Sequence, residues 1–365
     1  MPEAIRNVLL VIDRIMNPEQ AGTVRALVGR LGTRGVAAKV LCNSAGELGV
    51  EDDVSVIECP GLGDRWRRAW TLQGLRLDDG SGEPSLIHVF QARMAPVGLD
   101  LSEGRRIPYL QGVEEFLPDG SRLRLSRRWC RGIVATSREL ADDLRLHFEI
   151  PENWIRVVPR GLAGSEPAVS KKTETSVSVV GTAGRLHSGA GFATFLNAAR
   201  RVLDAGIDAE FVIVGQGEDE DDLHRRAERL KIVERVTFAG DAAAGFSFWD
   251  VLDVYCQPAT IPTVGRNLAR ALAHGLPAVA SDIEGLRSIV RHRVTGLRIP
   301  PGDTDALAKA ILELLENRPY ARSLGLAGRE AILFEHDIDR EAETLAGLYR
   351  SLAATAPRDL SAPPS

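Results

Sequence analysis

The stretch TIPTVGRNLARALAHGLPAVASDIEG, Thr260 to Gly285, contains a glycine loop, a short helix, a Gly-Leu-Pro turn and an apolar strand in that order. A loop that leads from a strand into a helix usually faces a ligand, because the amides at a helix N-terminus attract anions. The predicted helix carries Arg266 and Arg270, and no carboxylate follows until Asp282. The two arginines are four residues apart and share one helical face, so they either line a site for a negatively charged group or form a solvated pair.

The same alternation of short apolar runs and amphipathic segments extends over the whole chain and predicts an α/β fold. Strands are expected at 7–12, 37–42, 54–59, 86–90, 107–112, 132–137, 155–161, 177–184, 209–217, 235–240, 253–258, 277–282 and 296–301. Helices are expected at 20–34, 64–76, 121–131, 137–147, 189–205, 218–231, 265–274, 284–292 and 303–317. Hydrophobicity within the strands is continuous rather than alternating, so both faces of each sheet should be covered by helices.

A polar segment at 164–176 divides this series and is interpreted as a linker. It separates an N-terminal domain, 1–163, from a C-terminal domain, 177–335, each of doubly wound, Rossmann-like type. A last amphipathic helix within 336–354 is expected to return to the first domain. The Pro- and Ser-rich tail 355–365 is expected to be disordered.

Composition excludes several classes of protein. The net charge of −5 over 365 residues gives no case for nucleic-acid binding. The four cysteines are scattered without a CxxC pair or a histidine at metal-ligand spacing, which predicts buried thiols, no metal site and a cytoplasmic protein. No apolar run reaches the ~18 residues of a membrane span, although peripheral membrane contact stays open.

The second half resembles the donor domain of GT-B glycosyltransferases of family 4, also called glycosyl transferases group 1. GTAGRLHSGAG, AEFVIVGQG, RVTFAG and VYCQPATIPTVGRNLARALAHGLPAVASD follow in the order typical of that family. The likeness covers 177–350 well and 1–163 more weakly. It implies two Rossmann-like domains that face a central cleft. It also implies transfer of a sugar from a nucleotide diphosphate to an acceptor with retention, without a metal or other cofactor.

The resemblance assigns donor-binding roles to Gly184, Arg185, Gly191, Val264, Gly265, Arg266 and Arg270. Arg185 would pair with the diphosphate, because its planar guanidinium matches phosphate oxygens. The family's lysine before Gly191 is replaced by Ala190. The family's two glutamates, eight positions apart, are replaced by Pro262 and Arg270, neither of which can accept a hydrogen bond through its side chain.

On the acceptor side the resemblance assigns Gly22, Gln111 and Gly112, with Gln111 at the position of a family histidine. A Pro-Asn-Gly motif of the family stands here as Pro159-Arg160-Gly161. Two functions follow from this mixture of retained and lost residues. The first is an active glycosyltransferase with a rebuilt donor site. The second is a catalytically degenerate unit that binds or supports a protein partner, such as an active transferase.

Two basic segments are candidates for contact with an anionic partner. Arg124, Arg127, Arg128 and Arg131 would form one stripe if 121–131 were helical. Trp66 and Trp70 lie four residues apart beside Arg65, Arg67 and Arg68, a mixture that membrane-surface helices use. The favoured interpretation of the second segment is that both tryptophans pack on the sheet and the arginines face water.

Overall fold

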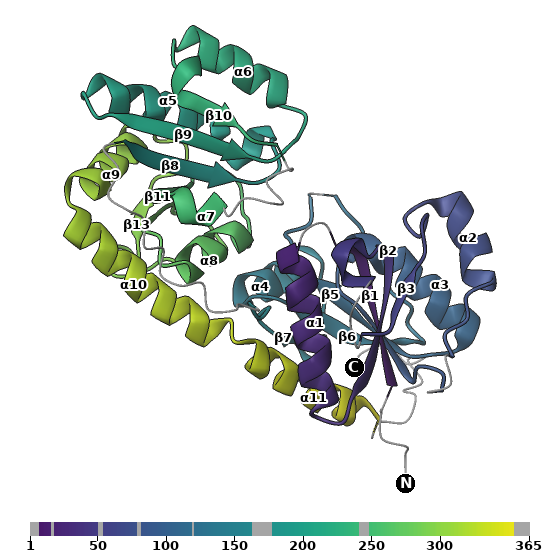
Figure 1. Ribbon diagram of the computed structural model, residues 1–365. Coiled ribbons are helices and arrows are strands. Elements are labelled where there is room, and N and C mark those ends of the chain that lie inside the picture. Colours follow the sequence, from purple (N-terminus) through teal and green to yellow (C-terminus); the bar gives the residue numbers. More distant parts are fainter. Residues whose placement is uncertain are drawn as a thin grey trace. The chain divides into compact units, whose positions relative to one another are not determined.

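The computed structural model describes residues 7–15, 18–49, 54–78, 82–118, 120–162, 177–240 and 248–353. The expected linker 164–176 and tail 355–365 lie outside these ranges. The chain divides into two compact units, hereafter unit 1 (1–164 with 336–365) and unit 2 (165–335). Each unit contains one parallel sheet covered by helices (Figure 1).

The sheet of unit 1 has the strand order β3-β2-β1-β4-β5-β6-β7, and all of its pairs are parallel. Its strands are β1 (Asn7–Arg14), β2 (Ala37–Ser44), β3 (Val56–Glu58), β4 (Leu86–Val89), β5 (Tyr109–Val113), β6 (Cys130–Ala135) and β7 (Ile155–Val157). Its helices are α1 (Pro18–Gly32), α2 (Arg65–Gln73), α3 (Ala95–Arg105), α4 (Arg138–His147) and α11 (Ile338–Ala353). The strand order reverses between β1 and β4, which is the point where doubly wound sheets bind ligands.

Alternate residues of β1 supply two separate cores. Leu10 and Ile12 face the cluster that includes α1 and α11, while Leu9 and Val11 face the cluster that includes α3. All four side chains are at most 5% exposed. The expectation that both faces of the sheet are covered is therefore confirmed for this unit.

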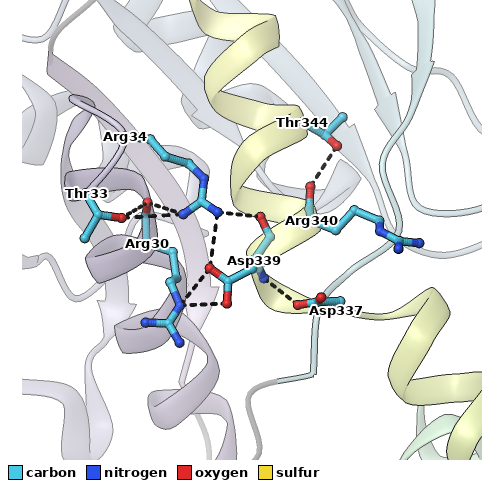
Figure 2. Close-up of polar contacts among 7 residues, drawn as sticks. All are labelled: Arg30, Thr33, Arg34, Asp337, Asp339, Arg340 and Thr344. Atoms are coloured by element: carbon cyan, nitrogen blue, oxygen red, sulfur yellow. Dashed lines mark hydrogen bonds and ion pairs between the residues drawn. The ribbon is translucent and has the colours of Figure 1, made fainter.

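Helix α11 completes the core of unit 1 although it comes last in the described chain. Ile338, Leu345 and Tyr349 are buried in the cluster that also contains α1. At the edge of this contact, the Asp339 carboxylate binds Arg30 Nε at 3.0 Å and Arg34 Nη2 at 3.2 Å (Figure 2). Asp339 lies in the first turn of α11, where the helix dipole favours a negative charge.

The sheet of unit 2 repeats the same winding, with the order β10-β9-β8-β11-β12-β13 and only parallel pairs. Its strands are β8 (Ser178–Ala183), β9 (Ala209–Val214), β10 (Val236–Phe238), β11 (Val254–Gln257), β12 (Ala278–Ser281) and β13 (Leu297–Ile299). Its helices are α5 (Phe192–Asp204), α6 (Glu220–Arg229), α7 (Phe248–Val251), α8 (Arg266–Ala273), α9 (Thr304–Glu316) and α10 (Arg318–Glu335). The strand order reverses between β8 and β11, so the expected fold, two Rossmann-like domains, is confirmed.

Two expected helices are wrong. Residues 121–126 are irregular and lead through a turn into β6, because Leu123 and Leu125 alternate with polar residues at period two rather than 3.6. The helical arginine stripe through Arg124 and Arg131 therefore does not form. Residues 284–289 are turns, because Gly285 takes a left-handed conformation with φ of 81°, which cannot continue a helix.

Candidate functional site

The carboxyl ends of β8 and β11 bring two loops of unit 2 together at its switch point. The Thr260 amide donates to the Gly189 carbonyl at 2.9 Å, which joins the loop after β11 to the loop after β8. The Asn267 side-chain amide, on α8, donates to the Ala183 carbonyl at 3.0 Å. The loops that contain the sequence-assigned donor residues are therefore neighbours in one compact region.

Two glycines fix the backbone of this region. Gly191 precedes α5 with φ of 81°, and a Cβ atom there would lie 1.8 Å from the Pro258 carbonyl oxygen. Gly265 precedes α8 with φ of 63°, and a Cβ atom there would lie 2.7 Å from Ile289. Neither residue has a side chain that could cap its helix. The first-turn amides of α5 and α8 thus have no capping side chain from the N-cap position, which suits a helix end that receives an anion.

Arg185 follows Gly184 at the end of β8, and its side chain is 76% exposed. Its Nη2 atom lies 3.2 Å from a carboxylate oxygen of Glu218, at the end of the loop after β9. The pKa of Glu218 is lowered, first by a hydrogen bond from its own amide and then by Arg185. His187 accepts a hydrogen bond from the Gly189 amide at 3.2 Å. An incoming phosphate would therefore compete with Glu218 for Arg185.

The loop before α8 has the position of a ligand-facing loop without the expected acids. Pro262 and Arg266 are exposed, whereas Val264 and Arg270 are half-buried. Burial raises the pKa of the Tyr255 hydroxyl and lowers the pKa of His274. The Arg270 charge makes a smaller contribution, which opposes the rise at Tyr255 and adds to the fall at His274. No carboxylate occurs between Thr260 and Gly275.

The sequence-assigned acceptor residues lie within unit 1 as follows. Gln111 is fully buried in β5, where its Nε2 atom donates to the Gly112 carbonyl at 2.8 Å and to the Gln91 carbonyl at 3.3 Å. Its Oε1 atom is buried and has no hydrogen-bond partner among the described residues. Gly22 is half-buried inside α1, and a Cβ atom there would meet nothing within 4 Å. The structure does not bring Gly22 and Gln111 into a shared contact.

A chain of charged and polar groups, which the sequence did not predict, crosses the carboxyl edge of the first sheet. The Asp13 amide donates to Gln91 Oε1 at 3.1 Å, and Gln91 Nε2 donates to Glu114 at 3.2 Å. Arg160 binds Glu114 at 3.3 Å and Glu341, on α11, at 2.8 Å. The side chains of both glutamates are at most 5% exposed. We call these five residues the Arg160 network.

The electrostatics of the Arg160 network follow from two buried carboxylates around one guanidinium. Burial raises the pKa of Glu341, and the Arg160 charge and the Gly161 amide, which donates at 2.7 Å, oppose that rise. Arg160 also lies over the Phe90 ring at 4.4 Å. One signal in the sequence could have revealed this network, because Glu341 falls on the apolar face of its helix between Ile338 and Leu345.

Two hollows adjoin this edge of unit 1. A cavity of about 10 Å³, close to the size of a single water, is bordered by His88, Glu114, Arg160 and Glu341. A larger, open hollow of about 390 Å³ lies where β1, β2 and β3 end. Its lining residues are Arg14, Ile15, Asn43, Ser44, Pro60 and Gly61. Asn43 donates to the Asp13 carboxylate at 2.5 Å and so connects this hollow to the Arg160 network.

The described residues lack two further kinds of site, a metal centre and a membrane span. None of these residues forms a group of three or more histidine, cysteine, aspartate or glutamate side chains that could hold a metal ion. Within the same ranges, every helix is too short or too polar to cross a bilayer. The four cysteines are all buried and unpaired, as expected from their spacing.

Comparisons with known proteins match both units. The family model described as Glycosyl transferases group 1 matches residues 177–317, and the model described as Glycosyltransferase Family 4 matches residues 20–163. A phosphatidyl-myo-inositol mannosyltransferase of Mycobacterium leprae is 34% identical over 170 residues, which are 45% of this chain and 44% of the relative. A lipopolysaccharide core biosynthesis glycosyltransferase of Rhizobium meliloti is 29% identical over 185 residues, 51% of this chain and 52% of the relative. The chain thus spans about half the length of these curated relatives.

Solved structures agree over nearly the whole chain. Sucrose-phosphate synthase from Thermosynechococcus elongatus has a TM-score of 0.74 at 18% identity and covers 96% of this chain and 100% of its own. Anabaena HepE in complex with UDP and glucose has a TM-score of 0.73 at 19% identity, over 94% and 99%. At such identities the likeness shows the fold alone. Together with the two family models, which cover most of both units, it places the chain in the GT-B glycosyltransferases of family 4, group 1.

Proposed function

We propose that the protein transfers a sugar from a nucleotide diphosphate sugar to an acceptor with retention, with unit 2 holding the donor and unit 1 the acceptor. The observation that carries this proposal is the region at the β8–β11 switch point. There Gly191 and Gly265 place two helix N-termini in neighbouring loops, and the exposed Arg185 lies at the end of β8. Helix amides and one arginine are the groups that stabilise a leaving diphosphate.

On the acceptor side, the proposal uses the open hollow at the ends of β1 to β3. Arg14 and Asn43 supply one cation and one amide on its wall, which suits an acceptor with hydroxyl or anionic groups. Gln111 is buried against backbone carbonyls and supports the strand end rather than reaching a substrate. The proposed transfer uses no metal or other cofactor. Four unpaired, buried cysteines support a cytoplasmic location.

Nucleotide binding tests the proposal directly. UDP, GDP or ADP at a hundredfold its dissociation constant should stabilise unit 2 by about 2.7 kcal/mol in thermal unfolding. Arg185→Ala should weaken the binding of that nucleotide about tenfold, because the substitution removes a charge-assisted hydrogen bond at an exposed position. Glu218→Gln should strengthen binding, because it removes the group that competes for Arg185. If none of the three nucleotides shifts the unfolding of the folded protein, the proposal is wrong.

A matched control separates the site from general charge effects. Arg235 is also exposed and ion-paired, with Asp208 at 2.6 Å, and it lies at the amino ends of β9 and β10. Arg235→Ala should leave nucleotide binding unchanged. Equal losses for Arg185→Ala and Arg235→Ala would show that the nucleotide binds elsewhere.

A second function is favoured by one specific observation, the replacement of both family glutamates by Pro262 and Arg270. In that case the unit binds an anionic ligand or a protein partner without catalysis. Turnover distinguishes the two functions. Release of free nucleotide from UDP-, GDP- or ADP-sugars, with or without added acceptors, supports the transferase, whereas nucleotide binding without any release supports the non-catalytic unit.

A further inference from the structure

Helix α2 presents two tryptophans to solvent. The Asp64 side chain caps the helix and accepts a hydrogen bond from the Trp66 amide at 2.9 Å. The inner face is held by Leu72, which packs on the core of unit 1, and by Arg68, which binds Asp100 of α3 at 2.6 Å. Trp66 and Trp70 are one helical turn apart, so they lie on the same face, and that face is opposite Arg68 and Leu72.

The exposure of this pair is the unusual feature. Trp66 is 83% exposed and Trp70 is 81% exposed, more than any other large apolar side chain in the described part of the chain. The sequence-based expectation that they pack on the sheet is therefore wrong. Single exposed apolar residues are common on protein surfaces, but adjacent large ones indicate a surface that something else covers.

Charge and side-chain chemistry indicate what covers the face of α2 that carries Trp66 and Trp70. The segment 60–76 contains four arginines and one aspartate, in a chain with a net charge of −5. Arg67 on the same helix is 78% exposed, with Asp64 3.9 Å away. Tryptophan combines an apolar ring with one N–H donor and therefore favours the headgroup layer of a bilayer. Arginines beside it complement anionic lipid headgroups.

Area argues against a second protein. Two tryptophan side chains offer roughly 300–500 Å² of contact, whereas a stable protein interface buries about 800 Å² on each partner. A lipid surface needs no matching shape, and a helix of this length can lie in the headgroup layer. We propose that α2 docks unit 1 on an anionic membrane surface, with Trp66 and Trp70 inserted among the lipids and Arg67 beside their phosphates.

Vesicle co-sedimentation of the full chain tests this proposal without any need for transferase activity. The wild type should pellet with vesicles in which phosphatidylglycerol replaces a third of the phosphatidylcholine, and less with phosphatidylcholine alone. Trp66→Ser with Trp70→Ser should reduce the partition coefficient more than tenfold, because both rings leave the interface. Arg67→Gln should reduce the partition coefficient about fivefold. Added salt should reduce the difference in partition coefficient between Arg67→Gln and the wild type, because it screens the attraction to the anionic lipid.

The matched control uses two exposed apolar residues of unit 2. Val233 and Val294 are 50% and 52% exposed, and Val233→Ser with Val294→Ser should leave vesicle binding unchanged. Thermal unfolding should show that both double variants stay folded, because surface substitutions usually change stability by less than about 0.5 kcal/mol.

Several results would overturn the proposal. These are failure of the wild type to bind anionic vesicles, and equal binding by the wild type and the Trp66/Trp70 double variant. Sedimentation velocity without vesicles supplies a third test. A dimer that forms in the wild type and is lost in the double variant would assign the tryptophan face to a second copy of the chain instead.

Discussion

Replacement of Arg160 by methionine tests the Arg160 network. Its guanidinium binds Glu114 at 3.3 Å and Glu341 at 2.8 Å, and both carboxylates are almost fully buried. Methionine keeps much of the side-chain length and removes the charge, which leaves two buried carboxylates without their shared cation. Breaking a buried ion pair from one side costs about 3–5 kcal/mol, so Arg160→Met should lower the free energy of unfolding of unit 1 by that amount at pH 7.

The loss should depend on pH. Burial already raises the pKa of Glu341, and removal of Arg160 raises it further. A carboxylate whose pKa is higher in the folded state binds its proton more tightly there. Its contribution to stability is therefore largest at low pH and falls as the pH rises through the folded pKa. Arg160→Met should consequently cost less at pH 5 than at pH 8, and the addition of Glu341→Gln should recover part of the loss at pH 8.

Urea unfolding followed by tryptophan fluorescence is a suitable assay. Trp66, Trp70, Trp129 and Trp154 belong to unit 1 and only Trp249 to unit 2, so the signal reports mainly on unit 1. Arg30→Met is the matched control, because Arg30 also joins the body of unit 1 to α11 but is 51% exposed (Figure 2). An exposed ion pair contributes about 0–1 kcal/mol. Equal losses for the two variants, or a loss for Arg160→Met that is independent of pH, would refute the reasoning.

Three further predictions concern buried groups. Gly191→Ala should destabilise unit 2 by about 2 kcal/mol more than Gly206→Ala, because both glycines have a positive φ but only at Gly191 would the Cβ atom meet a carbonyl. The unfolding transition of unit 2 in differential scanning calorimetry measures both costs, and equal costs would contradict the clash. Tyr349→Phe should cost about 1–3 kcal/mol, because it removes the hydroxyl that lies 2.7 Å from His88 Nδ1. The cost should be the same at pH 6 and pH 8, because burial lowers the pKa of His88 to about 3, and a dependence on pH would show that the imidazole titrates. The four cysteines should react with a disulfide reagent only after unfolding, because they are buried and burial raises the thiol pKa to about 12 at Cys42 and about 11 at Cys130; fast reaction of any thiol in the native protein would contradict this.

The sequence predicted the two sheets well because buried parallel strands have a strong local signature. Runs such as NVLLVI and AEFVIV become β1 and β9 without ambiguity. Helices with weak amphipathic patterns were harder to predict. Helix α3 contains Pro96 and Gly98 and was missed, since Gly98 is selected by its close approach to Val89 rather than by helix propensity. Such packing between elements is not visible in a local pattern.

The candidate site was predictable in position but not in its contacts. Gly191 and Gly265 were assigned from motif order, and the structure brings their loops together. The pairing of Arg185 with Glu218 joins residues 33 positions apart, and the Arg160 network joins residues as far apart as Asp13 and Glu341. Local periodicity carries no information on such long-range partners. The exposure of Trp66 and Trp70 was misjudged for the same reason, because the inner face of α2 is chosen by Leu72 and by Asp100 on another helix.

The return of α11 to the first sheet constrains how the chain can fold during synthesis. Ile338, Ala342, Leu345, Ala346 and Tyr349 of α11 fill a core whose other buried members lie between Val8 and Val158. A ribosome that adds about 5–20 residues per second delivers these side chains roughly 10–35 s after β7. The described strands and helices of unit 2 emerge from the ribosome in that interval. Unit 2 can therefore fold while the face of the first sheet that α11 covers is still exposed to solvent. A chaperone that binds exposed apolar surface during synthesis should therefore bind longest to this face of the first sheet.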